Sequence, residues 1–519
     1  MSEPVTLAID AGTGSCRAVV FDLTGAQLGL GQREWAHAAL PGVPGSQVFD
    51  TVGGWRLICE CVREALSAAG VGASRIAGVS ATSMREGMVL YDRAGNEIWA
   101  CPNVDGRAGE EGAALVASGA AESIYAEGGD WVSITSPARF RWIQRNQPGV
   151  YGAIAHMGML SDWIVTRLCG EFATDPSAGS SSGLFALPER TWSDRVLDLI
   201  ELPREVLPPV LDAGTAAGTV TARAAEETGL AQGTPVVVGG ADTQLGLIGL
   251  GLSEPNRSTV VGGTFWQATV TLDHALIDPQ RRLRTLCHSA PGQWMMEGIG
   301  FYSGFAFRWF RDAFCDLEQE RGTATGRSSY ELMEEAAMSV PPGSNGVVGL
   351  FSNVMDAKRW VQTAPGFLGF DIGDPAASGK KECIRAIEEA AAYAAFGHFE
   401  IVAEITGRPL TEAVFTGGAA NGRLWPQIVA DVLGVPIHVP QARESTALGA
   451  AMYAAVGAGL AASVSELGKA TRFERTFEPD AAVHETYLEL FARWRAVYRR
   501  TLEMVDDGVI RPLWRPAGA

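Results

Sequence analysis

One acidic residue near the middle of the chain, Asp242, stands where a general base could act. It follows the apolar run 235–238 and belongs to the segment GGADTQLG, so it lies just past the end of an expected strand. A carboxylate in that position can accept the proton of a substrate hydroxyl while the hydroxyl attacks a γ-phosphate. The segment alone does not distinguish this role from that of an aspartate that caps a helix or a turn.

The N-terminal segment 7–25 combines a second carboxylate with a glycine-rich turn. Its sequence, LAIDAGTGSCRAVVFDLTG, predicts a strand, a tight turn and a second strand. The turn can direct several backbone N–H groups and two hydroxyls toward one point, which is typical of anion binding. Asp10 at its mouth cannot hold a phosphate unless a cation lies between them, so the segment predicts a nucleotide phosphate with Mg²⁺. An ordinary hairpin with a glycine turn is the alternative.

Two later segments repeat this pattern. The segment 258–272, STVVGGTFWQATVTL, again predicts strand, glycine turn and strand, and the glycines at 417–418 follow another apolar run. Glycine is needed where a backbone approaches a ligand closely. If the two halves of the chain face each other, the turns at 12–14, 262–263 and 417–418 can line one cleft, with the first two near phosphates and the third under a flat base. Coincidence is the alternative, because strand–glycine–strand segments are common.

Two polar segments between residues 84 and 107 could recognise a second ligand. Arg85 and Glu86 in SMREG follow an expected strand end, and CPNVDGR contains Asn103, Asp105 and Arg107. Alternating donors and carboxylates suit a neutral polyhydroxy ligand, because each hydroxyl both donates and accepts a hydrogen bond. The same residues could equally form a salt-bridged loop.

Length and composition indicate two domains. A chain of 519 residues is too long for one core, and Gly, Pro and Asn break the pattern near 250–258, so we expect domains at 1–253 and 254–519. Alternating strand and helix patterns favour an α/β fold with partly parallel sheets. The sequence has no apolar run of about 18 residues and no export signal. We therefore expect a cytoplasmic protein whose eight cysteines are reduced and mostly buried.

The charge of the chain argues against several partners and motifs. A formal net charge of -18 disfavours nucleic acid and anionic membranes, because both need a positive surface. The first lysine is Lys358, so a phosphate site in the N-terminal half must use backbone N–H groups, hydroxyls, arginine or a metal. This excludes a Walker A loop and a protein-kinase lysine.

The order and spacing of these motifs resemble the FGGY carbohydrate kinases over nearly the whole chain. The matching segments are IDAGTGSCRAVVFD, SMREG, NVDGR, SDWIVTRLCGEFATDPS, GGADTQLG, VGGTFWQ, TGGAANGRLWPQIVADVLGVPI and ESTALGAA. The resemblance implies an α/β, two-domain, actin-like (ribonuclease H-like) ATPase fold. It also implies ATP, Mg²⁺ and transfer of the γ-phosphoryl group to a sugar or polyol hydroxyl in the interdomain cleft.

Carried over by position, the resemblance implies roles for individual residues. Asp242 is expected as the general base, and Asp10 is expected to hold the metal through water. Together with the turn residues, the expected nucleotide contacts are Gly12, Thr13, Gly14, Ser15, Arg17, Gly263, Thr264, Gly304, Gly417 and Gly418. The expected substrate contacts, with Asp105 from the polar segment, are Arg85, Glu86, Asp105 and Gln244. The chain departs from the family pattern at Ala419, where a third glycine is usual, and at Arg308, where glycerol kinases have a glutamine.

The expected substrate is a small hydroxyketone or polyol. Within the family, SMREGMVLYD, IWACPNVDGRA, GGTFWQ, FRWFRDAFC and PPGSNGV are most similar to kinases of linear dihydroxypentanedione, a quorum-sensing signal. A kinase of glycerol, xylulose or erythritol is the nearest alternative. A non-catalytic actin-like nucleotide switch is another, although a switch needs no base aimed at a second ligand. The resemblance also allows a homodimer and a sugar-phosphotransferase protein as a regulatory partner.

Overall fold

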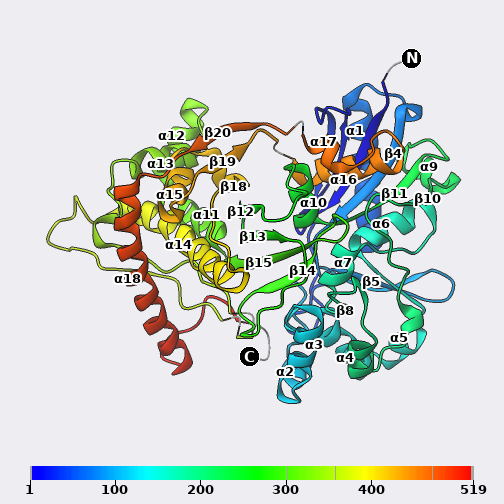
Figure 1. Cartoon of the computed structure of the whole chain (residues 1–519), viewed down its shortest axis with the longest axis horizontal. Coiled ribbons are helices and arrows are strands. Elements are labelled where there is room, and N and C mark those ends of the chain that lie inside the picture. The colour runs from blue at the N-terminus through cyan, green and yellow to red at the C-terminus, as the bar shows by residue number, and fades with distance from the viewer. Residues whose placement is uncertain are drawn as a thin grey trace.

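Two mixed β-sheets with helices packed around them form the two halves of the molecule (Figure 1). The computed structural model describes residues 3–300, 302–356, 358–359, 361–442, 444–469 and 471–515. The N-terminal half, coloured blue to green, lies beside a half coloured green to red. The α/β class expected from the alternating pattern is confirmed.

The N-terminal sheet has six strands in the order β10-β11-β4-β1-β2-β3. Strand β1 (Val5–Ala11) is antiparallel to β2 (Ser15–Phe21), which is antiparallel to β3 (Gln27–Glu34). On its other side β1 is parallel to β4 (Ile76–Ser83), and β4 is parallel to β11 (Pro235–Ala241). The edge strand β10 (Ala216–Thr219) is antiparallel to β11. The carboxyl ends of β1, β4 and β11 therefore meet at one edge of the sheet.

The C-terminal sheet repeats this arrangement in the order β14-β15-β13-β12-β18-β19-β20. Strands β12 (Ser258–Gly262), β13 (Trp266–Leu272) and β15 (Trp294–Gly300) are successively antiparallel, like β1, β2 and β3. Strands β18 (Ala413–Thr416) and β19 (Ile437–Pro440) continue parallel from β12, and β20 (Phe473–Phe477) is antiparallel. Strand β14 (Arg284–Cys287) is the edge strand on the other side of the sheet and is antiparallel to β15. The internal repeat expected from the two hairpins is thus present in strand order and direction.

Helices from both halves cover the N-terminal sheet. Helix α1 (Thr51–Ala69) packs on β2 and β3, and it begins where the Asp50 side chain accepts hydrogen bonds from two backbone N–H groups of its first turn. It ends at Gly70, which has a left-handed φ of 61°. The other face is covered by α10 (Asp242–Gly249) and by α16 (Ser445–Gly457), which packs against β1, β4 and β11. Figure 1 shows α16, in orange, lying among elements of the opposite half.

The C-terminal sheet is covered chiefly by long helices. Helix α14 (Lys380–Thr406) packs on β13 and β15 and contacts α11 (Ser303–Phe314), α15 (Leu424–Leu433) and α18 (Ala481–Asp506). The smaller elements around the two sheets are β5 (Met88–Tyr91), β6 (Glu97–Cys101), α2 (Gly109–Ala117), α3 (Ala120–Gly128), α4 (Ser136–Asn146), α5 (Pro148–Ala153), β7 (His156–Met159), α6 (Leu160–Cys169), α7 (Pro176–Ser181), β8 (Phe185–Ala186), β9 (Thr191–Trp192), α8 (Asp194–Ile200), α9 (Ala222–Thr228), α12 (Asp316–Thr325), α13 (Ser329–Ala337), β16 (Val348–Gly349), β17 (Phe367–Leu368) and α17 (Val464–Gly468).

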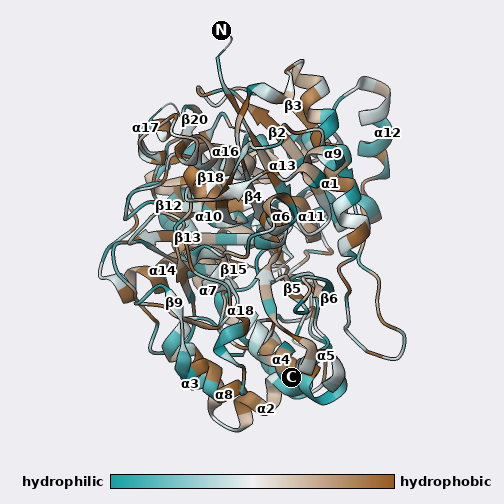
Figure 2. Ribbon diagram, turned by 90° about the vertical axis from the view of Figure 1, so that its right-hand side faces the viewer, coloured by the Kyte–Doolittle hydropathy of each residue, from teal (hydrophilic) through white to brown (hydrophobic). Residues whose placement is uncertain are grey.

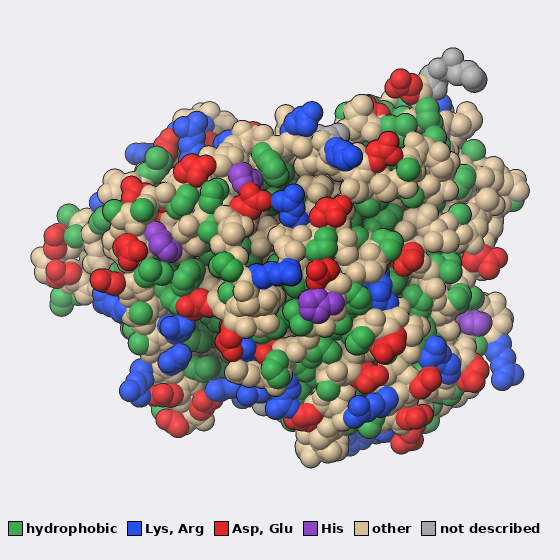
Figure 3. All heavy atoms as spheres, in the orientation of Figure 1, with side chains coloured by type: hydrophobic (Ala, Val, Ile, Leu, Met, Phe, Trp, Pro, Cys, Tyr) green, Lys and Arg blue, Asp and Glu red, His purple; other side chains and the backbone are tan. Residues whose placement is uncertain are grey.

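Apolar residues gather in the strands and in the inner helices. Figure 2 shows brown ribbon there and teal ribbon on outer helices such as α12. All eight cysteines are buried thiols, as expected. On the face drawn in Figure 3, Lys and Arg side chains are interspersed with Asp and Glu. In the described part of the chain, no helix has the length and apolar character that crossing a membrane requires.

Candidate active site

Three functional candidates lie at one edge of the N-terminal sheet because parallel strands end there together. Ala11 of β1 pairs with Ser83 of β4, which pairs with Ala241 of β11. Asp10 therefore lies at the end of β1, Arg85 just beyond β4 and Asp242 just beyond β11. Ligands of open α/β sheets bind beyond the carboxyl ends of their strands, so this edge is the candidate active site.

Asp242 is the first residue of α10 and remains partly open to solvent. Its side chain is 35% exposed, whereas that of Arg85, whose Nε lies 3.9 Å from Asp242 Oδ1, is 6% exposed. Asp242 Oδ1 also accepts a hydrogen bond of 2.7 Å from the Thr243 backbone N–H. Burial by surrounding protein raises the pKa of Asp242, and Arg85 opposes that rise. The arrangement offers an accessible carboxylate of increased basicity, which suits a general base.

Asp10 belongs to a cluster with more negative than positive charge. The Arg17 Nε lies 3.5 Å from Asp10 Oδ2, and the Arg17 guanidinium also donates to Glu444 at the start of α16. Burial raises the pKa of Asp10 to about 7; Arg17 lowers it, whereas Asp242 and Glu444 raise it further. A divalent cation would relieve this repulsion. Within the described residues no group of three or more His, Cys, Asp or Glu could hold a metal by itself. The donor set thus fits Mg²⁺ held by one carboxylate, water and phosphate oxygens.

The turn after β1 is held from its outer side. Trp35 Nε1–H donates to the Gly12 carbonyl at 3.0 Å, and His37 Nε2 lies 2.8 Å from the Thr13 carbonyl. The Thr13 hydroxyl and the Asn103 side-chain amide lie 3.1 Å apart. A Cβ built on Gly14 would meet no atom within 4 Å. The turn 12–15 is therefore held through its carbonyl groups, while Gly14 borders open space that a ligand can occupy.

The second and third glycine turns lie side by side, because β12 and β18 are parallel neighbours. A Cβ on Gly417, whose φ is 89°, would lie 2.6 Å from the Gly262 carbonyl oxygen. A Cβ on Gly304 would lie 2.0 Å from the Gly263 carbonyl oxygen, and the Phe305 N–H donates to the Thr264 carbonyl. Gly418 by contrast faces open space. The structure thus brings together the predicted residues of the C-terminal half: Gly263, Thr264, Gly304, Gly417 and Gly418.

Two side chains fix the loop that contains the third turn. The Arg475 guanidinium donates to the carbonyls of Ala420, Asn421 and Gly422. The Glu334 carboxylate accepts from the backbone N–H groups at the start of α15. A helix N-terminus attracts negative charge, so Glu334 stabilises this end of α15.

Arg85 and Glu86 each form a salt bridge with a residue of the C-terminal half of the chain. Arg85 donates two hydrogen bonds, of 2.7 and 3.1 Å, to Glu297 of β15. Glu86, with a left-handed φ of 59°, accepts from Arg284 of β14 at 2.7 Å. Asp130 lies 2.7 Å from the same guanidinium. Arg85 is thus beside Asp242 and is also part of a salt-bridged network, which combines the two alternatives that the sequence left open.

The other two substrate candidates have buried polar contacts. Both Asp105 oxygens accept from Arg107 Nε, at 2.7 and 2.9 Å, and Asp105 is 2% exposed. Gln244 on α10 is fully buried and donates to the Cys287 carbonyl at 3.2 Å, while its Oε1 has no hydrogen-bond partner. Direct contact of either residue with a substrate stays a prediction. A substrate hydroxyl that binds Asp105 would have to compete with Arg107 for its carboxylate.

Sequence reasoning missed Glu297, Arg284 and Glu444. A signal existed for Glu297, because it is the one acid in the otherwise apolar strand WMMEGIG, and buried carboxylates are rare unless they are paired. Nothing in the sequence indicated that its partner would be Arg85.

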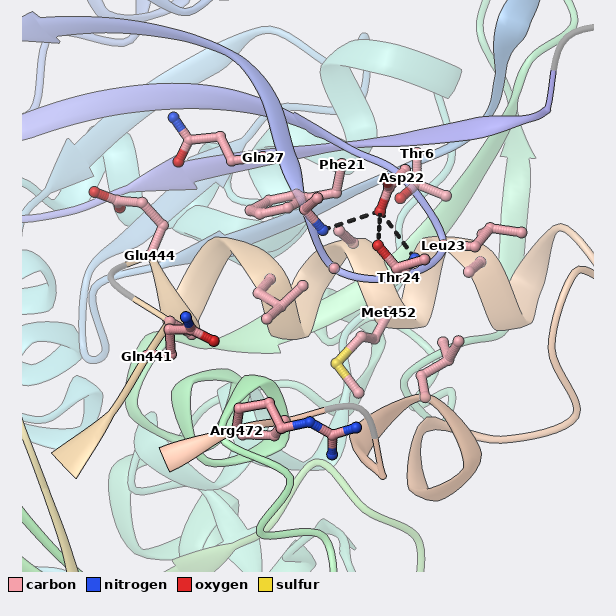
Figure 4. A pocket seen from close by; sticks show the side chains of 18 residues that line it. Thr6, Phe21, Asp22, Leu23, Thr24, Gln27, Gln441, Glu444, Met452 and Arg472 are labelled. Carbon is pink, nitrogen blue, oxygen red and sulfur yellow. Dashed lines mark hydrogen bonds between the residues drawn. The ribbon is translucent and has the colours of Figure 1, made fainter. Parts of the chain in front are cut away.

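A cavity of about 430 Å³ lies next to this site but not within it. It opens between the turn 22–27 and α16, and Figure 4 shows Glu444 at one end and Asp22 with Thr24 at the other. Glu444 is the residue that the cavity shares with the Asp10 cluster. The cavity therefore lies at the opposite end of β1 and β2 from the glycine turn.

The fold and the site define a two-domain carbohydrate kinase. The FGGY family of carbohydrate kinases matches with its N-terminal domain at residues 5–249 and its C-terminal domain at residues 260–458. The chain belongs to this family and is an ATP-dependent carbohydrate kinase.

Full-length relatives and solved structures agree with this assignment. The chain is 44% identical to an autoinducer-2 kinase of Escherichia coli (strain K12), with 100% of this chain and 98% of the relative covered. It is 42% identical to that of Yersinia enterocolitica, with 99% and 97% covered. Xylulose kinase from Rhodospirillum rubrum superposes with a TM-score of 0.84 at 26% identity, covering 96% and 99%. Plasmodium falciparum glycerol kinase with ADP superposes with a TM-score of 0.83 at 17% identity, covering 96% and 98%, which shows the shared fold.

Proposed function

We propose that this kinase transfers the γ-phosphoryl group of ATP to a primary hydroxyl of autoinducer-2 in its linear form, dihydroxypentanedione. The observation that carries the proposal is the full-length similarity to autoinducer-2 kinases at 42–44% identity. The geometry supports it, because a partly open carboxylate and a guanidinium lie together at the edge of the sheet. Donors and acceptors of this kind suit a small neutral ligand with hydroxyl and keto groups.

In this proposal Asp242 accepts the proton of the attacking hydroxyl. Burial raises the pKa of Asp242, which favours proton transfer to it, and Arg85 at 3.9 Å opposes that rise. Arg85 and Glu86 orient the substrate oxygens, and Gln244 offers a buried acceptor, Oε1, without a hydrogen-bond partner in the structure. Positioning of this kind supplies much of the rate in phosphoryl transfer.

The phosphates of ATP lie in this proposal between the two hairpin turns. Gly12, Thr13, Gly14 and Ser15 approach from one half, and Gly263 and Thr264 from the other. The adenine base of ATP lies in this proposal over Gly418, where the backbone borders open space. Mg²⁺, when bound, neutralises charge that develops on the phosphates, and Asp10 is the residue that would hold it through water.

The wider setting of the protein also belongs to the proposal. We place the reaction in the cytoplasm, where ATP is available. A homodimer and a sugar-phosphotransferase regulatory protein are partners that the family resemblance allows; size-exclusion chromatography with light scattering tests the first and a pull-down with the purified partner tests the second.

Mass spectrometry of the product made from ATP and dihydroxypentanedione tests the substrate. We expect one added phosphate on the substrate and equimolar ADP. A panel with glycerol, xylulose and erythritol, compared by kcat/KM, separates the proposal from the other family activities. A clear preference for one of these stable polyols or ketoses would overturn the choice of substrate, and ATP consumption that no alcohol increases would favour a nucleotide switch.

A further inference from the structure

A carboxylate with no solvent exposure lies between two guanidinium groups behind the candidate active site. Glu297 is 0% exposed and lies in β15 among methionine, isoleucine and glycine. Its two oxygens accept from Arg85 at 2.7 and 3.1 Å, and Arg284 Nε lies 3.7 Å from one of them. Burying a charge is costly unless it is paired. The pairing explains how Glu297 is tolerated but not why a charged group stands there.

The contacts of Glu297 connect the C-terminal sheet with the edge of the N-terminal sheet. Glu297 and Arg284 are cross-strand partners in β15 and β14. Arg85 follows β4 in the other half, and beyond it lies Asp242. Asp242 is 35% exposed, whereas the side chains of the other three residues are at most 6% exposed. Of these four residues, only Asp242, where the substrate is expected, is substantially accessible to solvent, and Glu297 lies at the buried end of the network.

The two hydrogen bonds to Glu297 determine which N–H donors of Arg85 remain available for other partners. Glu297 takes a hydrogen from each terminal nitrogen of the guanidinium, a paired geometry that fixes the plane of the group. An arginine has five N–H donors, so three remain. The Nε edge faces Asp242. Without Glu297, the guanidinium could turn and pair with Asp242 through its terminal nitrogens.

We propose that Glu297 is a positioning residue of the kinase reaction: it holds Arg85 end-on, so that Arg85 keeps its remaining N–H donors for the alcohol substrate and meets Asp242 only through its Nε edge, without pairing with it through the terminal nitrogens. Glu297 does not touch the substrate and acts through Arg85. The inference deepens the proposed function and rests on it for the identity of the alcohol and for the roles of Arg85 and Asp242.

A matched set of variants separates positioning from fold stability. Glu297→Gln keeps the size of the side chain and removes the charge, and Glu297→Asp keeps the charge on a shorter stem. Glu389→Gln is the control, because Glu389 is a buried carboxylate paired with Arg385 at 2.9 Å in α14, outside the candidate site. We expect both Gln variants to lower the melting temperature. Only Glu297→Gln should raise KM for the alcohol by about tenfold and lower kcat by about tenfold, with KM for ATP changed less than about twofold.

A double-mutant cycle with Arg85→Gln gives the decisive measurement. If Glu297 acts through Arg85, the kinetic effect of Glu297→Gln should nearly vanish in the Arg85→Gln background. Glu297→Asp should restore part of kcat/KM relative to Glu297→Gln. Fully additive effects, or an unchanged KM for the alcohol in Glu297→Gln, would overturn the inference. If Glu297→Gln does not fold, the same cycle is run with Glu297→Asp and Arg85→Lys, whose charges are retained, and additivity decides in the same way.

The cycle uses whichever alcohol the wild-type enzyme phosphorylates best. Failure of dihydroxypentanedione as a substrate appears in the wild-type protein and counts against the proposed function. Failure of the Glu297 inference appears in the variants, with any accepted alcohol. The two outcomes are therefore distinguishable.

Discussion

The hairpins that open the two sheets have the same topology but different chemistry. In the N-terminal hairpin Asp10 pairs in register with Arg17, one step before the turn. At the equivalent step of the C-terminal hairpin, Val261 pairs with Gln267. The first hairpin therefore carries charge beside its turn, and the second carries an apolar residue and an amide.

The glycine of the N-terminal turn and the glycines packed against the C-terminal hairpin also serve different purposes. A Cβ on Gly14 would meet nothing within 4 Å, whereas Cβ atoms on Gly304 and Gly417 would collide with the carbonyls of Gly263 and Gly262. Glycine in the C-terminal half allows backbone to pack on backbone, and glycine in the N-terminal turn leaves room for a ligand. The first hairpin thus carries charge beside an open turn, whereas the turn of the second hairpin is packed against backbone from α11 and from the end of β18.

The largest expected effect comes from removing the general base that we propose at the end of β11 in the N-terminal sheet. Asp242→Asn should lower kcat by a factor of roughly 100 or more while leaving ATP affinity largely intact, because the amide cannot accept the proton. Steady-state kinetics and nucleotide titration measure both. Asp50→Asn, at the N-terminus of α1, is the control for an aspartate that only caps a helix. Near-normal turnover of Asp242→Asn would remove Asp242 from its role.

A pair of alanine substitutions tests the different uses of glycine. Gly304→Ala forces backbone apart and should cost about 1–3 kcal/mol of stability and raise KM for ATP by about tenfold. Gly14→Ala should leave the melting temperature nearly unchanged and affect only nucleotide binding. Thermal unfolding and ATP kinetics of the two variants are compared directly. Equal melting temperatures for Gly304→Ala and the wild type would contradict the packing argument.

The smallest expected effect concerns the charge of the first hairpin in metal-free protein. The pKa of Asp10 is raised from 3.8 to about 7 in the folded state. The folded protein therefore binds this proton more tightly than the unfolded chain, and stability falls as pH rises from about 4 to 7. Asp10→Asn removes this penalty, so its melting temperature should exceed that of the wild type by about 5 °C at pH 8, with a smaller difference at pH 5.

Thermal unfolding in chelator, with Asp50→Asn as the control, measures this difference. If the melting temperatures of the wild type and of Asp10→Asn respond to pH in the same way between pH 5 and 8, the pKa of Asp10 is not raised in the folded protein. Addition of Mg²⁺ and ATP should reduce the advantage of Asp10→Asn at pH 8, because a dication stabilises the carboxylate.

The local units and the residues at their ends could be predicted from the amino-acid sequence. Hairpins, glycine turns and capped helices depend on neighbours a few residues apart, so the patterns around Asp10, Gly263 and Asp242 could be identified without coordinates. The repeat of the hairpin in both halves followed from the same local pattern. The family resemblance added the two-domain kinase fold, which the family matches and solved structures bear out.

Which side chains meet across the molecule depends on the packing of distant segments. Arg85 and Glu297 are separated by 212 residues, and Arg17 and Glu444 by 427. Helix α16 follows six of the seven strands of the second sheet in sequence, yet it packs on the first sheet. Such pairings depend on how two sheets and their helices pack together, and no local pattern encodes them. That packing makes Glu297, an isolated acid in an apolar strand, the partner of Arg85 at the end of the first sheet.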